Sequence, residues 1–155
     1  MAINKHFDIN ALFERLAEKL NIVFDLVVEA LNKTCLEITI EAKQLKTYTD
    51  RTNNLRSSIG YVVYNRGEKA LEHFQKDGNG ENGDGNSGIR KGRALAEQAA
   101  KEYPNDIVGV IVAGEDYALY VESKGYDVLT GPCSRLQELF LKNLRAVFDG
   151  AGIIE

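Results

Sequence analysis

The first third of the chain carries a long one-sided apolar repeat, and this repeat constrains the fold more than any other feature. Charged residues such as Glu14, Glu18 and Lys19 fall between the apolar ones, which is typical of an amphipathic helix. Asp8 is the expected N-cap. The apolar residues recur at spacings of three or four, in a phase that continues to Thr47: Ile9, Leu12, Leu16, Leu20, Val23, Val27, Leu31, Ile38, Ala42 and Leu45.

Two interpretations of this segment remain open. Asn21 is a place where the helix could bend, and the stretch from Cys35 to Ile40 also alternates like a strand. One long helix with a break and two separate helices therefore both fit. A helix this long cannot bury its whole apolar face inside a compact globule of 155 residues. We therefore expect it to pack on a sheet and on a neighbouring subunit.

The rest of the chain is predicted to form short elements. Polar turn residues occupy 48–54. Strands are expected where β-branched and aromatic residues run together or alternate: 59–64, 106–114 and 117–122, with a hairpin at 114–116 between the last two. Helical stretches are expected as a short turn at 68–75, from 89 until just before Pro104, and from 132 or 134 to 150.

This order of elements, α, β, α, β, β, α, predicts an α+β fold in a single domain, 1–155. We expect a long N-terminal helix (or two helices), a small, mainly antiparallel sheet of three to four strands, and a C-terminal helix packed on the sheet. With so few strands, we expect the helices to lie together on one face of the sheet and to bury its apolar side.

Composition leaves little material for side-chain catalysis, because the 155 residues include two histidines, two cysteines and no tryptophan. A four-ligand zinc site would need His6, Cys35, His73 and Cys133, which are not at metal-ligand spacing, so we expect structural thiols, no metal and no cofactor. A net charge of −4 is not typical of a dedicated nucleic-acid binder. Neither a signal peptide nor a membrane span is predicted, so we expect a soluble protein made inside the cell, with no membrane partner.

The segment from about 76 to 88 is a Gly/Asp/Asn-rich inserted loop, and from Asp77 to Gly88 it has no apolar residue. Since such a composition cannot form a core, we expect the loop to become ordered only in an assembly. Gly78 to Gly83 matches the dinucleotide pattern GxGxxG, and 83–88 has the glycine spacing of a P-loop. The context excludes both, because no strand precedes the glycines, acidic residues would repel a phosphate, and the P-loop lysine is missing.

Several charged side chains suggest a binding or catalytic role, but none forms a complete constellation. The candidate calcium ligands are Asp77, Asn79, Glu81 and Asp84, in a loop without the glycine and the final glutamate that such a site needs. His73 beside Glu72 could be a base with its orienting carboxylate, but the sequence places no nucleophile near it. The carboxylates around the expected hairpin, Glu115, Asp116 and Glu122, also lack partners, so no catalytic residue is assigned.

A basic cluster, Arg90, Lys91 and Arg93, lies at the expected start of a helix. Positive charges there oppose the helix dipole and call for a counter-charge. The candidates are the acidic loop just before the cluster, a neighbouring subunit and nucleic acid. The alternative is a solvated charged turn.

Two segments resemble one known family. The first, Asp50-Arg51-Thr52-Asn53-Asn54-Leu55-Arg56-Ser57-Ser58-Ile59, follows the long helix and opens a strand, and the second is Tyr117-Ala118-Leu119-Tyr120-Val121-Glu122, followed by Gly125. Together they look like the tail-component family of tailed bacteriophages, the gene-product-ten type of the lambdoid siphophages. The positions that this resemblance marks are Asp50, Thr52, Asn53, Leu55, Arg56, Ser58, Ile59, Tyr117, Ala118, Tyr120, Val121, Glu122 and Gly125. Asn53 stands where the family usually has glycine, and 67–88 is an insertion relative to it.

The resemblance implies a structural virion protein: a ring-forming head–tail connector or tail-completion subunit, located in the neck or tail of the virion and made in the host bacterial cytoplasm. Its implied partners are copies of itself, the portal-side head connector, tail-tube proteins, and DNA that passes through the lumen without sequence-specific binding. The family has no known chemistry, so we expect no enzymatic activity. The alternatives are a small soluble enzyme or a ligand- or calcium-binding module that uses the acidic loop 77–84, and a protein-binding regulatory domain.

Overall fold

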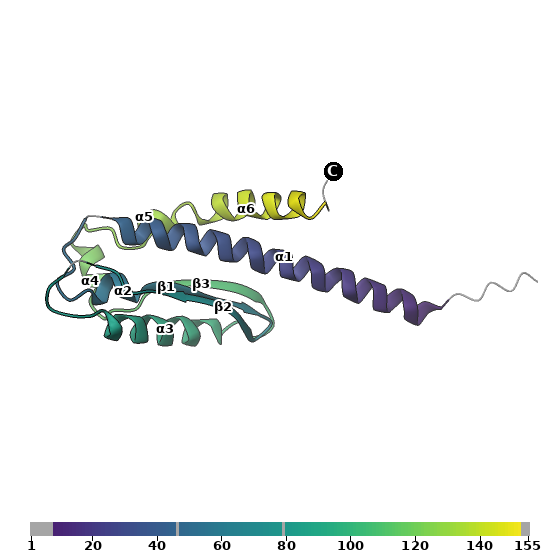
Figure 1. The fold of residues 1–155 in the computed structure, drawn as a ribbon, viewed down its shortest axis with the longest axis horizontal. Coiled ribbons are helices and arrows are strands. Elements are labelled where there is room, and N and C mark those ends of the chain that lie inside the picture. Colours follow the sequence, from purple (N-terminus) through teal and green to yellow (C-terminus); the bar gives the residue numbers. More distant parts are fainter. Residues whose placement is uncertain (1–7, 46, 79, 153–155) are drawn as a thin grey trace, which may run out of the picture.

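The computed structural model describes residues 8–45, 47–78 and 80–152 and has an α+β fold (Figure 1). Its helices are α1 (Ile9–Gln44), α2 (Asn54–Ser58), α3 (Asn86–Ala100), α4 (Ala118–Ser123), α5 (Thr130–Cys133) and α6 (Leu136–Gly150). Its strands are β1 (Ile59–Asn65), β2 (Glu68–Phe74) and β3 (Ile107–Ala113). The predicted fold class, a long N-terminal helix with a small antiparallel sheet and a C-terminal helix, is therefore confirmed.

The N-terminal segment is one unbroken helix of 36 residues. Asp8 caps this helix as predicted, because its Oδ1 accepts the backbone N–H groups of Asn10 at 3.0 Å and Ala11 at 3.2 Å. The helix continues through Asn21 and through 35–40, which excludes both the bend and the strand. The segment contains no glycine or proline, and its apolar phase is maintained throughout, which explains the continuity.

The sheet has three strands in the order β2-β1-β3, and both pairings are antiparallel. Arg66 and Gly67 join β1 to β2 with φ values of 52° and 84°, the left-handed conformation that a two-residue hairpin turn requires. This turn lays the next segment alongside β1, with Asn65 opposite Glu68. The helical turn expected at 68–75 is therefore wrong, because the turn geometry and the pairing with β1 override the local helix propensity.

The strand expected at 117–122 is also wrong, because this segment forms α4. The backbone N–H of Val121 donates to the carbonyl oxygen of Tyr117 at 3.0 Å, and Ala118 is buried on the inner side of the helix. The alternation in the sequence extends over too few residues to separate a period of 2 from a period of 3.6. The hairpin expected at 114–116 is thus absent, and β3 remains at the edge of the sheet.

Helices lie on both faces of the sheet, which corrects the expectation that they share one face (Figure 1). Val62 of β1 packs in a cluster with Ala96 and Ala100 of α3, whereas the next residue, Val63, packs in a cluster with Cys35 of α1. Consecutive residues of a strand point to opposite faces. Because the apolar residues of β1 are continuous, the strand needs a helical layer on each side.

The C-terminal helix α6 lies along α1 and not directly on the sheet, contrary to the predicted packing (Figure 1). Its buried residues Leu139, Asn143 and Val147 form a stripe with a spacing of four. Asn143 Nδ2 donates to Thr34 Oγ1 at 3.2 Å and to Glu37 Oε1 at 3.0 Å, both on α1. Since α1 already covers that face of the sheet, α6 forms a further layer outside α1.

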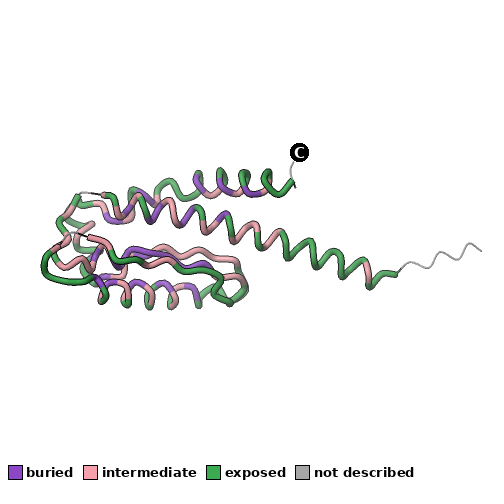
Figure 2. The backbone as a smooth tube through the Cα atoms, viewed as in Figure 1, coloured by how far each residue is buried: buried purple, intermediate pink, exposed green. Residues whose placement is uncertain are grey.

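The N-terminal half of α1 projects beyond the sheet and beyond α6 (Figures 1 and 2). We call residues 9–22 the exposed half of α1. The large apolar side chains of this half are between 40% and 60% exposed: Ile9, Leu12, Phe13, Leu16, Leu20 and Ile22. The folded chain therefore leaves the first part of its apolar stripe uncovered. None of the helices that the structure describes has the length and apolarity needed to cross a membrane.

Candidate functional site

The first motif, 50–59, forms the junction between α1 and β1. Asp50 Oδ2 accepts the backbone N–H of Arg56 at 2.8 Å and so caps the short helix α2 from outside it. Leu55 and Ile59 are 1% and 0% exposed and belong to one core cluster with residues of α1 and α4. These motif residues therefore fix the path of the chain from the long helix into the central strand.

Short hydroxyl side chains hold both ends of α2. Thr52 Oγ1 accepts the N–H of Asn54 at 3.4 Å. At the other end, Ser58 Oγ donates to the carbonyl oxygen of Leu55 at 2.8 Å and accepts the N–H of Glu115 at 3.2 Å. The last of these bonds ties the first motif to the link between β3 and α4.

Arg56 connects the junction to the end of α1. Its Nη2 donates to the carbonyl oxygen of Leu45 at 2.9 Å, and its guanidinium carbon lies 5.6 Å from the centre of the Tyr48 ring. Burial raises the pKa of the Tyr48 hydroxyl to about 12, although the positive charge of Arg56 opposes this shift. Tyr48 therefore stays neutral throughout the physiological range and serves as an aromatic support for the arginine.

The glycine-rich loop wraps around this junction. Asn53, which has a φ of 61°, donates through Nδ2 to the carbonyl oxygens of Gly80 at 2.8 Å and Gly83 at 2.7 Å. Its Oδ1 accepts the N–H of Gly80 at 2.6 Å, and Ser57 Oγ exchanges two hydrogen bonds with the backbone of Asp77. The described part of the loop therefore makes its hydrogen bonds within the chain, and its expected ordering in an assembly stays a prediction.

Close backbone contact explains why this loop is rich in glycine. A Cβ atom at Gly80 would overlap the backbone of Arg51, and one at Gly88 would overlap the carbonyl group of Asn54. A Cβ at Gly92, one turn further along α3, would overlap the carbonyl group of Ser58. The loop and the start of α3 thus pack directly against the motif backbone, which only glycine permits.

The second motif forms α4 and the turn after it. Glu122 Oε1 accepts the backbone N–H groups of Val128, Leu129 and Thr130 at 2.7–3.2 Å. Burial raises the pKa of Glu122, but these hydrogen bonds outweigh burial, so its pKa lies below the ordinary value. Gly125 follows with a φ of 85°, a conformation that favours glycine.

The fold brings the two motifs together. A pocket of about 360 Å³ is lined by residues of both, including Thr52 and Leu55 from the first motif and Tyr117 and Val121 from the second. Ala118 packs in the same core cluster as Leu55. By contrast, Tyr120 and its neighbour Leu119 point outward and are 61% and 78% exposed.

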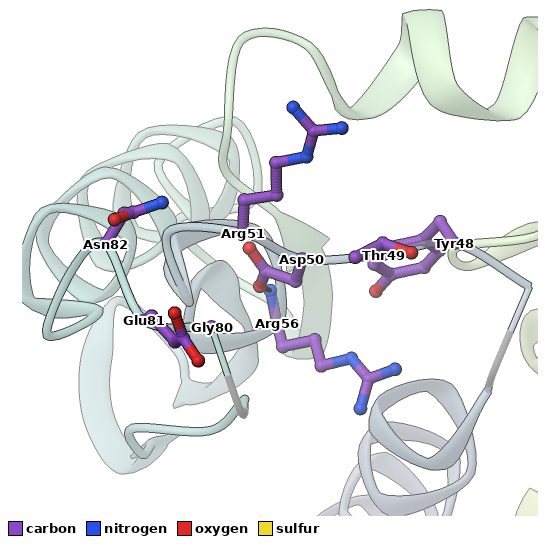
Figure 3. A pocket seen from close by; sticks show the side chains of 8 residues that line it. All are labelled: Tyr48, Thr49, Asp50, Arg51, Arg56, Gly80, Glu81 and Asn82. Atoms are coloured by element: carbon purple, nitrogen blue, oxygen red, sulfur yellow. Dashed lines mark hydrogen bonds between the residues drawn. The ribbon is translucent and has the colours of Figure 1, made fainter.

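A second pocket, of about 450 Å³, opens between the junction and the loop (Figure 3). It is lined by Tyr48, Thr49, Asp50, Arg51, Arg56, Gly80, Glu81 and Asn82. Three buried polar atoms of this lining have no hydrogen-bond partner within the described chain: Tyr48 Oη, Asp50 Oδ1 and Arg56 Nε. Arg56 Nε is a donor, Asp50 Oδ1 is an acceptor and the Tyr48 hydroxyl can donate or accept, so the pocket has the hydrogen-bonding capacity for water or a small polar group.

The basic cluster has its counter-charges within the chain. Lys91 Nζ lies 2.9 Å from Glu115 and 2.7 Å from Asp116, and Arg93 lies 3.0 Å from Glu72 of β2. The acidic loop is therefore not the counter-charge of these two cations. Arg90 is exposed at the surface of α3. Because these carboxylates are used in ion pairs and Glu122 caps a turn, the structure does not assemble the three carboxylates into one site.

The calcium candidates act in local capping. Asp77 Oδ1 accepts the N–H of Gly78 at 2.7 Å, and Asp84 Oδ1 accepts the N–H of Asn86 at 3.0 Å at the start of α3. Glu81 is exposed at the rim of the second pocket, and Asn79 lies outside the described residues. The described residues contain no group of three or more side chains that could hold a metal ion.

The remaining candidates, His73 and Glu72, contact neighbouring side chains. His73 stacks on Tyr61 with the ring centres 5.6 Å apart, while Glu72 pairs with Lys69 and Arg93. Burial, together with the nearby Lys43, lowers the pKa of His73. Both described cysteines are free thiols, and His6 lies outside the described residues.

Two residues of the junction, Asn54 and Ser57, were not among the predicted site residues. Asn54 Oδ1 accepts the N–H of Gly88 at 3.3 Å, and Ser57 holds the backbone of Asp77. The sequence signal that could have identified them is two consecutive short polar residues at each end of this five-residue helix: Asn53-Asn54 and Ser57-Ser58. The side chains of such residues often form hydrogen bonds with nearby backbone groups.

Comparisons with known proteins identify no relative: no family model, curated protein or solved structure matches the chain.

Proposed function

We propose that this chain is a ring-forming structural subunit of the neck of a tailed phage, a head–tail connector or tail-completion protein. The observation that carries the proposal is the exposed half of α1, which projects from the body with its apolar side uncovered (Figure 2). A contact with a neighbouring copy would cover this surface. The motif resemblance supplies the particular class of assembly.

The uncovered apolar side of this half is as large as the largest apolar patch of a typical monomer, and such a patch is often functional. The six large apolar side chains of the exposed half are 40–60% exposed. Ile22 lies on the other side of the helix, and the remaining five share one side. With about 150–200 Å² for each large apolar side chain, these five leave roughly 400 Å² of apolar surface exposed. Contiguous patches of this size commonly mark interaction surfaces.

A second apolar surface lies at the opposite end of the molecule, at α4 (Figure 1). It consists of Leu119, Tyr120 and Tyr126, which are 78%, 61% and 49% exposed. Two different surfaces at opposite ends favour a head-to-tail contact, and such a contact closes into a ring when the rotation between copies allows it. In this arrangement, α1 of one copy packs on α4 of the next.

The junction then has a mechanical role. It fixes the angle between the long helix and the sheet, and through Ala118 it also fixes the position of α4. The two helices that carry the proposed contact surfaces, α1 and α4, therefore meet in one core cluster through Ala42 and Ala118. The net charge of −4 favours a lumen through which DNA passes without being bound, since basic walls would hold its phosphates.

The test is the assembly state of the purified chain, measured by light scattering and negative-stain electron microscopy. We expect closed rings with a mass that is a multiple of 17.2 kDa. A monodisperse monomer at every concentration, also in the presence of head-connector and tail-tube proteins, would contradict the proposal.

A further inference from the structure

The outer edge of β3 has no backbone partner among the described residues. β1 pairs with one side of β3, and the sheet ends on the other side (Figure 1). No backbone hydrogen bond from another described segment reaches that outer side. The segment that the sequence predicted as the next strand, 117–122, folds as α4 and leaves the edge open.

The register shows which backbone groups point outward. At the two ends of the β1–β3 pair, the N–H of Arg66 donates to Asp106 O at 2.9 Å and the N–H of Gly114 donates to Ser58 O at 3.2 Å. Bonded and non-bonded pairs alternate in an antiparallel ladder, so the even-numbered residues of β3 bond to β1. The N–H and C=O groups that point to the open edge belong to the odd-numbered residues: Ile107, Gly109, Ile111 and Ala113.

The two edges of the sheet differ in how they are protected. β2 carries Glu68, Lys69 and Glu72, and its register with β1 shifts between Val63 and Tyr64. Charges and bulges are the usual protection against pairing with another strand. β3 reads Ile-Val-Gly-Val-Ile-Val-Ala over seven residues, without charge, proline or register shift. Its edge is therefore a ready template for strand addition.

We propose that the outer edge of β3 binds an extended, uncharged segment of a partner polypeptide as a fourth strand of the sheet. Backbone hydrogen bonds to Ile107, Gly109 and Ile111 would provide the affinity, and the apolar neighbourhood would select uncharged side chains. A second copy is a poorer fit. Its β2 edge is charged, and its β3 is flanked by α1 and α3, which would have to pack against the same helices of the first copy.

This surface is separate from the exposed half of α1, so the inference does not depend on the proposed ring. The test is amide hydrogen exchange of the full chain by NMR, with and without a synthetic peptide. The probe is the β1 sequence, Ile59–Asn65, flanked by lysines for solubility, because β1 is a strand that already pairs with β3. The control peptide carries V62P and V63P, which remove two donors and disfavour the extended ladder.

We expect the free protein to show alternating protection along β3. Amides of Val108, Val110 and Val112 should exchange slowly, and those of Gly109 and Ile111 rapidly. Saturating β1 peptide should slow Gly109 and Ile111 at least tenfold, and the control peptide should not. The proposal is overturned if Gly109 and Ile111 are already slow in the free chain, if the β1 peptide leaves them fast, or if both peptides act alike.

Discussion

The two halves of α1 carry the same apolar repeat but have different surroundings. In the C-terminal half, Ile38 and Ala42 are 0% exposed, and Ala42 packs in a core cluster with Leu55. In the N-terminal half, Leu16 and Leu20 are 47% and 54% exposed. The comparison shows that helical periodicity specifies a helix and its apolar side, but not the element that covers this side.

The same contrast applies on a smaller scale to residues outside α1. Gly88 lies against the backbone of Asn54, whereas Gly150, at the end of α6, has no atom near the position of a Cβ. Asn143 is 6% exposed and bonded to α1, whereas Leu141 on the same helix is 45% exposed. Paired substitutions can therefore measure how much each covered surface contributes.

The largest difference is expected between Ile38→Ala and Leu16→Ala. Ile38 lies in a packed core, so its truncation should lower the free energy of unfolding by about 2–5 kcal/mol through lost burial and a cavity. Leu16→Ala should lower it by less than about 1 kcal/mol in the monomer, because the side chain is already half exposed. Urea unfolding in dilute solution measures both. Equal losses would show that the two halves are equally covered.

Gly88→Ala should destabilise the protein by about 1–3 kcal/mol, because the new Cβ has no space beside the backbone of Asn54. Gly150→Ala, at a helix end with open space, should be neutral or stabilising by up to about 1 kcal/mol. Thermal unfolding followed by circular dichroism compares the two. If Gly88→Ala unfolds at the wild-type temperature, the loop does not pack on the junction.

Asn143→Ala tests the contact between α6 and α1 at the centre of the buried stripe of α6. The variant removes the hydrogen bonds to Thr34 and Glu37, and it should cost about 1–2 kcal/mol. Leu141→Ala on the exposed side of α6 is the matched control and should cost under about 0.5 kcal/mol. The free energies of unfolding are measured with urea. If Leu141→Ala costs more than Asn143→Ala, the side of α6 that carries Leu141 packs on α1, which would contradict the structure.

The stability of the protein at alkaline pH depends on the burial of Cys35, which lies in the C-terminal half of α1. Burial, with a smaller contribution from Cys133, raises the pKa of the Cys35 thiol from 9.0 to about 12. Between these values the unfolded chain releases this proton and the folded chain keeps it, so stability falls as pH rises from about 9 to 12. Cys35→Ala should reduce this decline, by at most about 1.4 kcal/mol per pH unit. Unfolding curves at pH 8, 9.5 and 11 for both proteins check it, and parallel declines would contradict it.

Much of the fold could be predicted because the decisive information is local. A cap at Asp8 and an apolar phase without glycine or proline are sufficient to predict a helical N-terminal segment, but they left a break near Asn21 and a strand at 35–40 open, and the structure shows one helix. The β-branched runs that become β1 and β3 are equally local signals. β2 could not be recognised, because Glu68 and Lys69 do not favour a strand, and the positive φ values of Arg66 and Gly67 place it beside β1.

The candidate site depends on contacts between distant segments, which no local pattern records. The composition of the loop predicted that it cannot form a hydrophobic core of its own. It did not predict that the glycines of the loop pack on the backbone of the first motif. The acidic partners of Lys91 come from the link after β3, 24 and 25 residues along the chain. The motif positions were found in the sequence, whereas their role as a junction required the structure.

The central claim, that the exposed half of α1 is a contact between copies, is tested most directly by sedimentation velocity of two charge-matched variants. Leu16→Glu combined with Leu20→Glu places two negative charges on the apolar side, and Arg15→Glu changes the net charge equally on the polar side. We predict that wild type and Arg15→Glu sediment as the same ring and that the double variant sediments as a folded monomer of 17.2 kDa. A double variant that assembles like wild type would contradict the claim.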